Sequence, residues 1–149
     1  MLERIPSTLR KVGTPEILAL VAYSILNGES EFDQDKEHFW VIGLNTKLVV
    51  KYADLVSLGT LDAALVHPRE VFRVAVHKGV ARIAIVHNHP SGDPTPSRED
   101  HNVTESLKKA GQILGIDVVD SVVIGNGTGS CASIGGSVRY FSVDPKSTP

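Results

Sequence analysis

The stretch ARIAIVHNHPSGDPTPSRED, residues 81–100, combines an apolar run, two histidines, a loop rich in proline and glycine, and a polar segment. The apolar run from Ile83 to Val86 is continuous, as in a strand that is buried on both faces of a sheet. Pro90 ends such a strand because proline has no N–H to donate, and SGDPTP forms a short, stiff connection. The stretch therefore predicts a central strand that ends at the histidines and leads into a helix.

The two histidines and the polar segment predict a metal site. Side chains i and i+2 of a strand lie on the same face, so His87 and His89 can direct both imidazoles at one point. Ser97 is a natural N-cap, and Asp100 then falls in the first helical turn, from which its carboxylate can face the strand end. Two neutral imidazoles and one carboxylate bind zinc and leave a fourth position open, as in catalytic sites.

Each of these residues also has an ordinary structural interpretation. Histidines at a strand end are often only solvated, Ser97 can be a plain cap, and Asp100 can be a first-turn charge favoured by the helix dipole. The metal hypothesis is favoured because all the features fall within a short segment and each is oriented by a separate local rule.

The rest of the chain predicts a mixed α/β fold, in which helices flank a sheet. A helix is indicated where a cap residue, apolar residues at helical spacing and a glycine stop coincide. A short apolar segment that ends at Val66 is a candidate for a further strand. The predicted helices are 14–28, one that begins at Pro68, and 97–115; the predicted strands are 39–44, 48–52, 83–86 and 116–125, with 126–130 as a loop.

Composition limits the function. The 149 residues suffice for about one domain. A formal net charge of -2 argues against a protein whose main task is to bind phosphate backbones. Cys131 is the single cysteine, which excludes an internal disulfide and a cysteine-rich zinc cluster, and we expect it to be buried and unreactive. No signal peptide or membrane span is evident, so we expect a cytoplasmic protein that does not interact with membranes.

The segment HNHPSGDPTPSRED, residues 87–100, resembles the JAMM (also called MPN) metalloprotease motif: H-x-H, seven residues, then S-x-x-D. It is most similar to the RadC-family version of that motif. The resemblance covers roughly residues 35 to 125, because three further segments read like RadC sequences: EHFWVIGLN (37–45), GTLDAALVHPREVF (59–72) and LGIDVVDSVVIG (114–125).

This resemblance implies a JAMM/MPN fold with a cytidine-deaminase-like, three-layer architecture. It implies that His87, His89 and Asp100 bind Zn²⁺ and that the hydroxyl of Ser97 stabilises an oxyanion. JAMM enzymes also use an upstream glutamate as general acid and base. Glu37 is the best match for that glutamate, and a second glutamate, Glu70 in HPRE, remains the competitor.

The resemblance also divides the chain. We expect an N-terminal helical segment (1–34, a remnant or an extension), a RadC-type JAMM/MPN domain (35–142) and a loose tail (143–149). Full-length RadC proteins usually carry an N-terminal helix-hairpin-helix region associated with DNA contacts, for which these 149 residues have no room. His101 and Ser121 depart from the residues common in relatives. His101 neighbours Asp100 on the helix but points elsewhere, so we expect no direct ligation from it.

Two functions remain in competition. The first is a zinc metallopeptidase or related hydrolase that cleaves a peptide, isopeptide or other amide bond of an unknown substrate. The second is a non-catalytic binding module associated with DNA repair or recombination. A degenerate JAMM protein that acts through partners is a third interpretation. Edge strands in a short chain also make a homodimer plausible.

Overall fold

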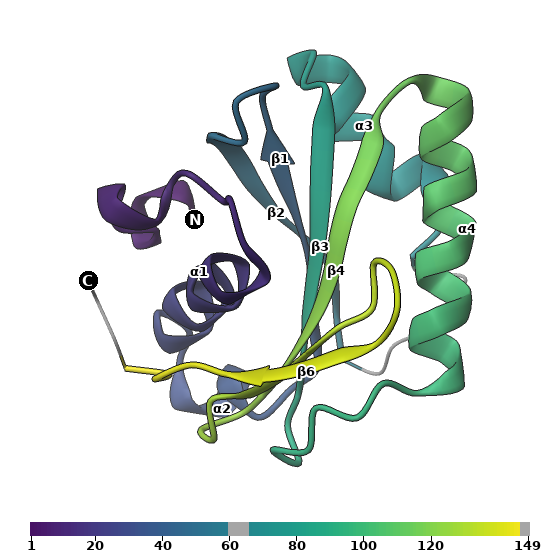
Figure 1. Ribbon diagram of the computed structural model, residues 1–149. Helices are drawn as coiled ribbons and strands as arrows, with labels where there is room; N and C mark the ends of the chain where they lie inside the picture. Colours follow the sequence, from purple (N-terminus) through teal and green to yellow (C-terminus); the bar gives the residue numbers. More distant parts are fainter. Residues whose placement is uncertain (60–65, 147–149) are drawn as a thin grey trace.

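A computed structural model of the chain describes residues 1–59 and 66–146. A six-stranded mixed sheet forms the middle layer, with α1 (Pro15–Asn27) on one face and α3 (Pro68–Lys78) and α4 (Arg98–Leu114) on the other (Figure 1). The mixed α/β architecture with three layers, predicted above, is therefore confirmed.

The strand order places the ends of three strands at one edge. The order is β2-β1-β3-β4-β5-β6, in which only the β3–β4 pairing is parallel. The carboxyl ends of β3 and β4 therefore lie beside the amino end of β1. The remaining elements are β1 (His38–Leu44), β2 (Val50–Leu58), β3 (Arg82–His89), β4 (Asp117–Gly125), β5 (Ser130–Ser133), β6 (Arg139–Ser142), α2 (Glu31–Gln34) and two 3-10 turns, η1 (Leu2–Arg4) and η2 (Ser7–Leu9).

The core is divided between the two faces of the sheet. On the α1 side, Trp40 and Val86 are fully buried, and so is Cys131, as the sequence predicted for this cysteine. On the α3 and α4 side, Val41 and Ile85 are equally buried. All residues of β1 and nearly all of β3 are buried because helices cover both faces, which explains the continuous apolar runs in the sequence.

Local sequence signals set the helix ends. The hydroxyl of Thr14 accepts a hydrogen bond from the N–H of Ile17 at the start of α1, and Gly28 caps its end. Gly115 ends α4 with a left-handed φ of 72°, a conformation that glycine adopts without steric cost. The three predicted helices are therefore confirmed, to within a residue or two at their ends.

The structure differs from the prediction in the strands. β5 and β6 were not predicted, and β2 continues to Leu58 rather than ending near Tyr52. The candidate strand before Val66 falls largely on residues 60–65, outside the described residues. Before α1, Ile5 and Leu9 pack into the core cluster on the α1 side of the sheet. In the part of the chain that the structure describes, no helix has the length and apolarity needed to cross a membrane.

Candidate metal centre

Four side chains converge where β3 ends, α4 begins and the chain enters β1. Glu37, His87, His89 and Asp100 each offer one ligand atom, and these atoms all lie within 4.8 Å of one another. Strand alternation puts both histidines on the α4 side of β3, and the antiparallel pairing of Phe39 with His87 brings the entry of β1 alongside them. The predicted convergence of histidines and carboxylate is therefore present, with Glu37 as a fourth member.

Asp100 is fixed by the first turn of α4. The Ser97 hydroxyl accepts from the Asp100 N–H at 3.1 Å, and Asp100 Oδ2 accepts from the Ser97 N–H at 2.8 Å, which completes a capping box. The same carboxylate meets both imidazoles, with Oδ1 2.9 Å from His87 Nε2 and Oδ2 3.1 Å from His89 Nε2. The cap thus aims a carboxylate that is only 2% exposed at the strand end.

The backbone of the loop after β3 orients His89. Its Nδ1 lies 2.9 Å from the Asp93 carbonyl oxygen, which can only accept a hydrogen bond. In the neutral imidazole the proton is therefore on Nδ1, and the lone pair is on Nε2, the atom that faces Asp100. This arrangement is the usual support of a metal-binding histidine.

Two buried atoms at the centre of the group have no hydrogen-bond partner among the described residues. His87 Nε2 and Asp100 Oδ1 lack one although they are 2.9 Å apart, and both side chains are almost fully buried. Buried polar atoms that make no hydrogen bond cost free energy and call for an explanation. A divalent cation shared with His89 would bind both atoms, so the donor set fits a zinc site.

The charges of the group are strongly coupled. Burial alone would raise the pKa of Asp100, but contacts with His87 and His89 outweigh burial and hold this pKa well below its usual range. The hydrogen bond with Asp100 raises the pKa of His89, burial opposes that shift, and the Asp93 carbonyl adds to it. Asp100 is thus a carboxylate, and its contact with His89 favours the protonated form of that imidazole over the neutral form that binds a metal ion.

The remaining candidates occupy distinct positions. Ser97 is exposed, and its oxygen accepts in the cap while its O–H stays available as a donor. Glu37 is half-buried within the group. Glu70 lies outside the group, on α3, where it is 43% exposed and 3.6 Å from Arg73. His101 is also outside the group and exposed.

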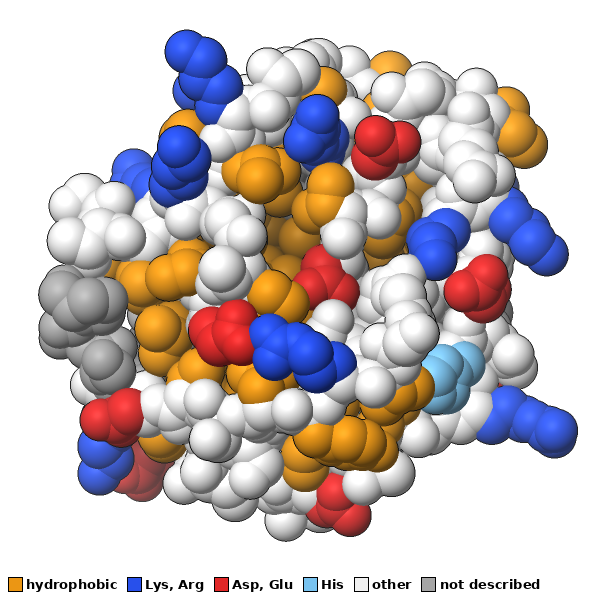
Figure 2. All heavy atoms as spheres, viewed as in Figure 1, with side chains coloured by type: hydrophobic (Ala, Val, Ile, Leu, Met, Phe, Trp, Pro, Cys, Tyr) orange, Lys and Arg blue, Asp and Glu red, His pale blue; other side chains and the backbone are white. Residues whose placement is uncertain are grey.

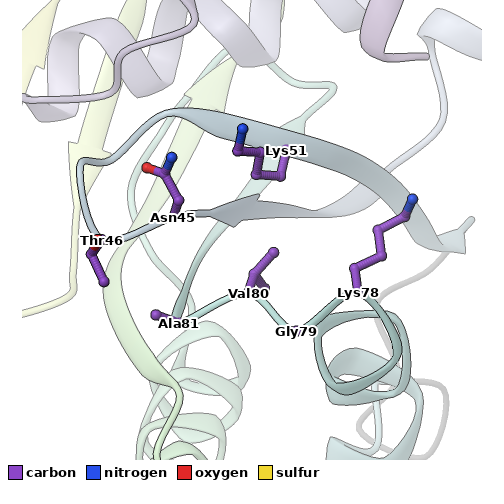
Figure 3. A pocket seen from close by; sticks show the side chains of 7 residues that line it. All are labelled: Asn45, Thr46, Lys51, Lys78, Gly79, Val80 and Ala81. Atoms are coloured by element: carbon purple, nitrogen blue, oxygen red, sulfur yellow. The ribbon is translucent and has the colours of Figure 1, made fainter.

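A pocket lies elsewhere on the molecule. The cavity in Figure 3, of about 450 Å³, is lined by the turn after β1 and by the segment between α3 and β3. It is therefore at the opposite end of β1 and β3 from the metal-ligating group. Its lining includes Lys51 and Lys78 but no histidine or carboxylate, so it does not belong to the candidate metal centre.

Sequence reasoning missed two polar residues behind the group. Asn88 is fully buried between the two histidines of β3, and its amide is hydrogen-bonded to Asn126 and to the segment that carries Glu37. A signal was available, because a polar residue in the interior of a buried strand must find hydrogen-bond partners.

The fold and the group together define a class: an α/β domain in which two histidines and two carboxylates that could hold a metal ion converge where β3 meets α4. The family described as RadC-like JAB domain matches residues 19–137. The chain belongs to this RadC family.

Curated relatives carry only a family designation. A UPF0758 protein of Desulforamulus reducens is 53% identical over 94 residues, which cover 63% of this chain and 41% of that protein. A UPF0758 protein of Methanosarcina mazei is 44% identical over 118 residues, or 79% of this chain and 49% of the relative. One from Clostridium kluyveri is 46% identical over 117 residues, with coverages of 78% and 49%. The chain thus spans about half the length of the curated relatives it matches.

Proposed function

We propose that this domain is a zinc-dependent hydrolase that cleaves a peptide, isopeptide or other amide bond. His87, His89 and Asp100 would hold the metal, because they offer a two-nitrogen, one-carboxylate set with an open fourth position. A zinc ion bound there would supply Lewis-acid activation of water and of the scissile carbonyl. The family membership and the two buried atoms without a hydrogen bond, His87 Nε2 and Asp100 Oδ1, support this assignment.

The side chains around the metal ligands have separate proposed roles. Glu37 takes a proton from the attacking water and returns it to the leaving nitrogen as the C–N bond breaks, so that the products are an acid and an amine. The exposed O–H of Ser97 donates to the oxygen of the scissile carbonyl as negative charge develops there. The observation that carries this proposal is the position of Glu37 in the same group as the ligands.

A screen of fluorogenic peptides and of lysine-linked isopeptides tests the hydrolase. We expect zinc-loaded wild type to cleave a subset of these substrates. Glu37→Gln should retain its metal but lose about 10²–10⁴-fold in kcat, as when a general acid-base group is removed. Glu70→Gln is the matched control, because Glu70 lies outside the group and is ion-paired with Arg73, and it should cleave like wild type. Equal cleavage by wild type and Glu37→Gln would refute the assigned role of Glu37.

The alternative role is a non-catalytic, DNA-associated module. Its support in the structure is the pair Lys51 and Lys78 at the pocket of Figure 3. Against it stands the net charge of -2, and the face shown in Figure 2 carries basic and acidic side chains interspersed rather than a basic patch. Fluorescence polarisation with single- and double-stranded DNA at low salt separates the two roles. We expect no binding, whereas tight, salt-sensitive binding that Lys51→Glu abolishes would favour the alternative.

A further inference from the structure

Asn88 separates the two histidine ligands in the sequence and points to the opposite face of the sheet from them. Strand alternation places its side chain on the α1 and α2 side, whereas His87 stacks on Phe39 on the α4 side. The Asn88 side chain is completely buried. It is therefore not a metal ligand, and its amide must be satisfied by the protein.

The Asn88 amide is hydrogen-bonded to the residues on both sides of Glu37 in the chain. Asn88 Oδ1 accepts from the N–H of His38 at 2.6 Å, and Asn88 Nδ2 donates to the carbonyl oxygen of Lys36 at 3.0 Å. These two groups belong to the residues immediately before and after Glu37 in the chain. The backbone that carries Glu37 is thus held on both sides by one side chain, which comes from the same strand as the histidines.

A second asparagine extends this support. Asn126, in the turn after β4, accepts from Asn88 Nδ2 at 2.9 Å and donates through its own Nδ2 to the Gln34 carbonyl at 2.8 Å. Gln34 is the last residue of α2, so the two amides anchor the segment between α2 and β1. Every partner of Asn88 is a fixed donor or acceptor, apart from the Asn126 amide, which Gln34 orients.

The backbone of Glu37 is itself hydrogen-bonded to the end of β2. Its carbonyl oxygen accepts from the N–H of Gly59, at the end of β2, at 2.8 Å. Glu37 precedes β1 and lies outside its ladder with β3, so hydrogen bonds of β1 alone do not fix its position. Proton transfer requires a base held to within about 0.5 Å, and a displacement of about 1 Å can cost 10²-fold in rate.

We propose that Asn88, supported by Asn126, is a positioning residue that ties Glu37 to the strand carrying the two histidine ligands. The catalytic part of this inference rests on the proposed hydrolase function. The mechanical part, which is that the Asn88 amide fixes the backbone at Glu37, does not. Because His87, Asn88 and His89 are consecutive, one short strand segment sets both the metal ligands and the base.

The test compares Asn88→Ala with Ser121→Ala. Ser121 is buried and hydrogen-bonded to Thr104 beneath α4, so its replacement removes a buried hydrogen bond without touching the segment of Glu37. The first readout is amide hydrogen exchange of the zinc-free proteins. In Asn88→Ala we expect the Gly59 N–H, which donates to Glu37, to exchange about tenfold faster than in Ser121→Ala, as expected when a segment opens locally. Equal protection of Gly59 in both variants would overturn the proposal.

The second readout applies once a substrate is known. Asn88→Ala should retain one zinc per chain and lose about 10–100-fold in kcat with little change in KM. On a Glu37→Gln background the same substitution should have almost no further effect, because the base is already absent. An equal loss on both backgrounds would overturn the positioning role. If no substrate is ever cleaved, the proposed function fails, while the exchange experiment still decides whether Asn88 holds the segment.

A milder variant, Asn126→Ala, still tests the proposal if Asn88→Ala does not fold. Asn126→Ala removes only the outer amide, on a half-buried turn residue, and frees the Gln34 carbonyl. We expect an intermediate rise in Gly59 exchange and an intermediate loss of kcat. A protein with the exchange and kcat of wild type would contradict the supporting role of Asn126.

Discussion

Replacing Asp100 by asparagine separates the structural role of this residue from its metal-binding role. The carboxylate accepts from the Ser97 N–H and meets His87 and His89 at 2.9 and 3.1 Å, whereas an asparagine has one oxygen to serve them. Losing one hydrogen bond to a charged group and weakening the cap should cost about 1–3 kcal/mol without metal. In EDTA, the free energy of unfolding of Asp100→Asn should therefore be lower than that of wild type by this amount.

Zinc should then increase the difference in the free energy of unfolding between wild type and Asp100→Asn. At a free zinc concentration one hundredfold above its Kd, binding stabilises the folded wild type by about 2.7 kcal/mol. For a domain of this size that corresponds to about 5–11 °C in Tm. Asp100→Asn should gain little from the same zinc, because one ligand has lost its charge.

Thermal unfolding in EDTA measures the contribution of Asp100 to stability without metal. The same measurement in buffered zinc gives the additional stabilisation by the metal. Glu99→Gln is the control, because Glu99 also lies in the first turn of α4 but outside the metal-ligating group. We expect this control to gain the full zinc stabilisation. If the difference between wild type and Asp100→Asn were the same with and without zinc, Asp100 would serve only as a capping residue and the assignment of it as a ligand would be refuted.

Two further predictions concern pH and backbone packing. The hydrogen bond with Asp100 raises the folded-state pKa of His89, so its stabilising contribution is complete below the unfolded value of about 6.5 and is lost as pH rises through the folded pKa. Urea unfolding in EDTA should therefore show stability falling above about pH 6.5, and a flat profile there would contradict the coupling. Gly125→Ala should destabilise the fold by about 2 kcal/mol or more, because a Cβ would overlap the Gly92 carbonyl oxygen, while Gly136→Ala, which meets nothing nearby, should behave like wild type. Equal melting temperatures for the two alanine variants would refute the packing argument.

The helices and the grouping of His87, His89 and Asp100 were predictable because local rules determine them. Caps such as Thr14 and Gly115 act within a few residues of the helix end. Likewise, strand alternation fixes His87 relative to His89, and the capping box fixes Asp100 relative to Ser97. None of these relations depends on a distant part of the chain. The start of α4 must also approach the end of β3, and the short, stiff loop between them brings this about.

The missed strands lack such local signals. β5 and β6 have four residues each, too few to show a clear alternation, and β6 lies at a sheet edge with mostly exposed side chains. The second half of β2 is half-buried and mixes polar with apolar residues, so its continuation to Leu58 depends on pairing with β1. Tertiary pairing, rather than intrinsic preference, sets these elements.

The choice between Glu37 and Glu70 depends on long-range pairing. Both glutamates precede or begin a regular element, and each has an ordinary local role. Only the register that pairs Phe39 with His87 brings Glu37 beside the histidines. Asn88 was missed for the same reason, because its backbone partners, at Lys36 and His38, lie about fifty residues earlier in the chain.

Metal content is the most direct test of the central claim that this RadC-family domain has a zinc site built from His87, His89 and Asp100. Elemental mass spectrometry should be run on wild type, His87→Ala, Asp100→Ala and the Glu37→Gln variant after equilibration with zinc at neutral pH. We predict about one zinc per chain in wild type and in Glu37→Gln, and almost none in the two ligand variants. Wild type without zinc, or full zinc content in His87→Ala, would contradict the account.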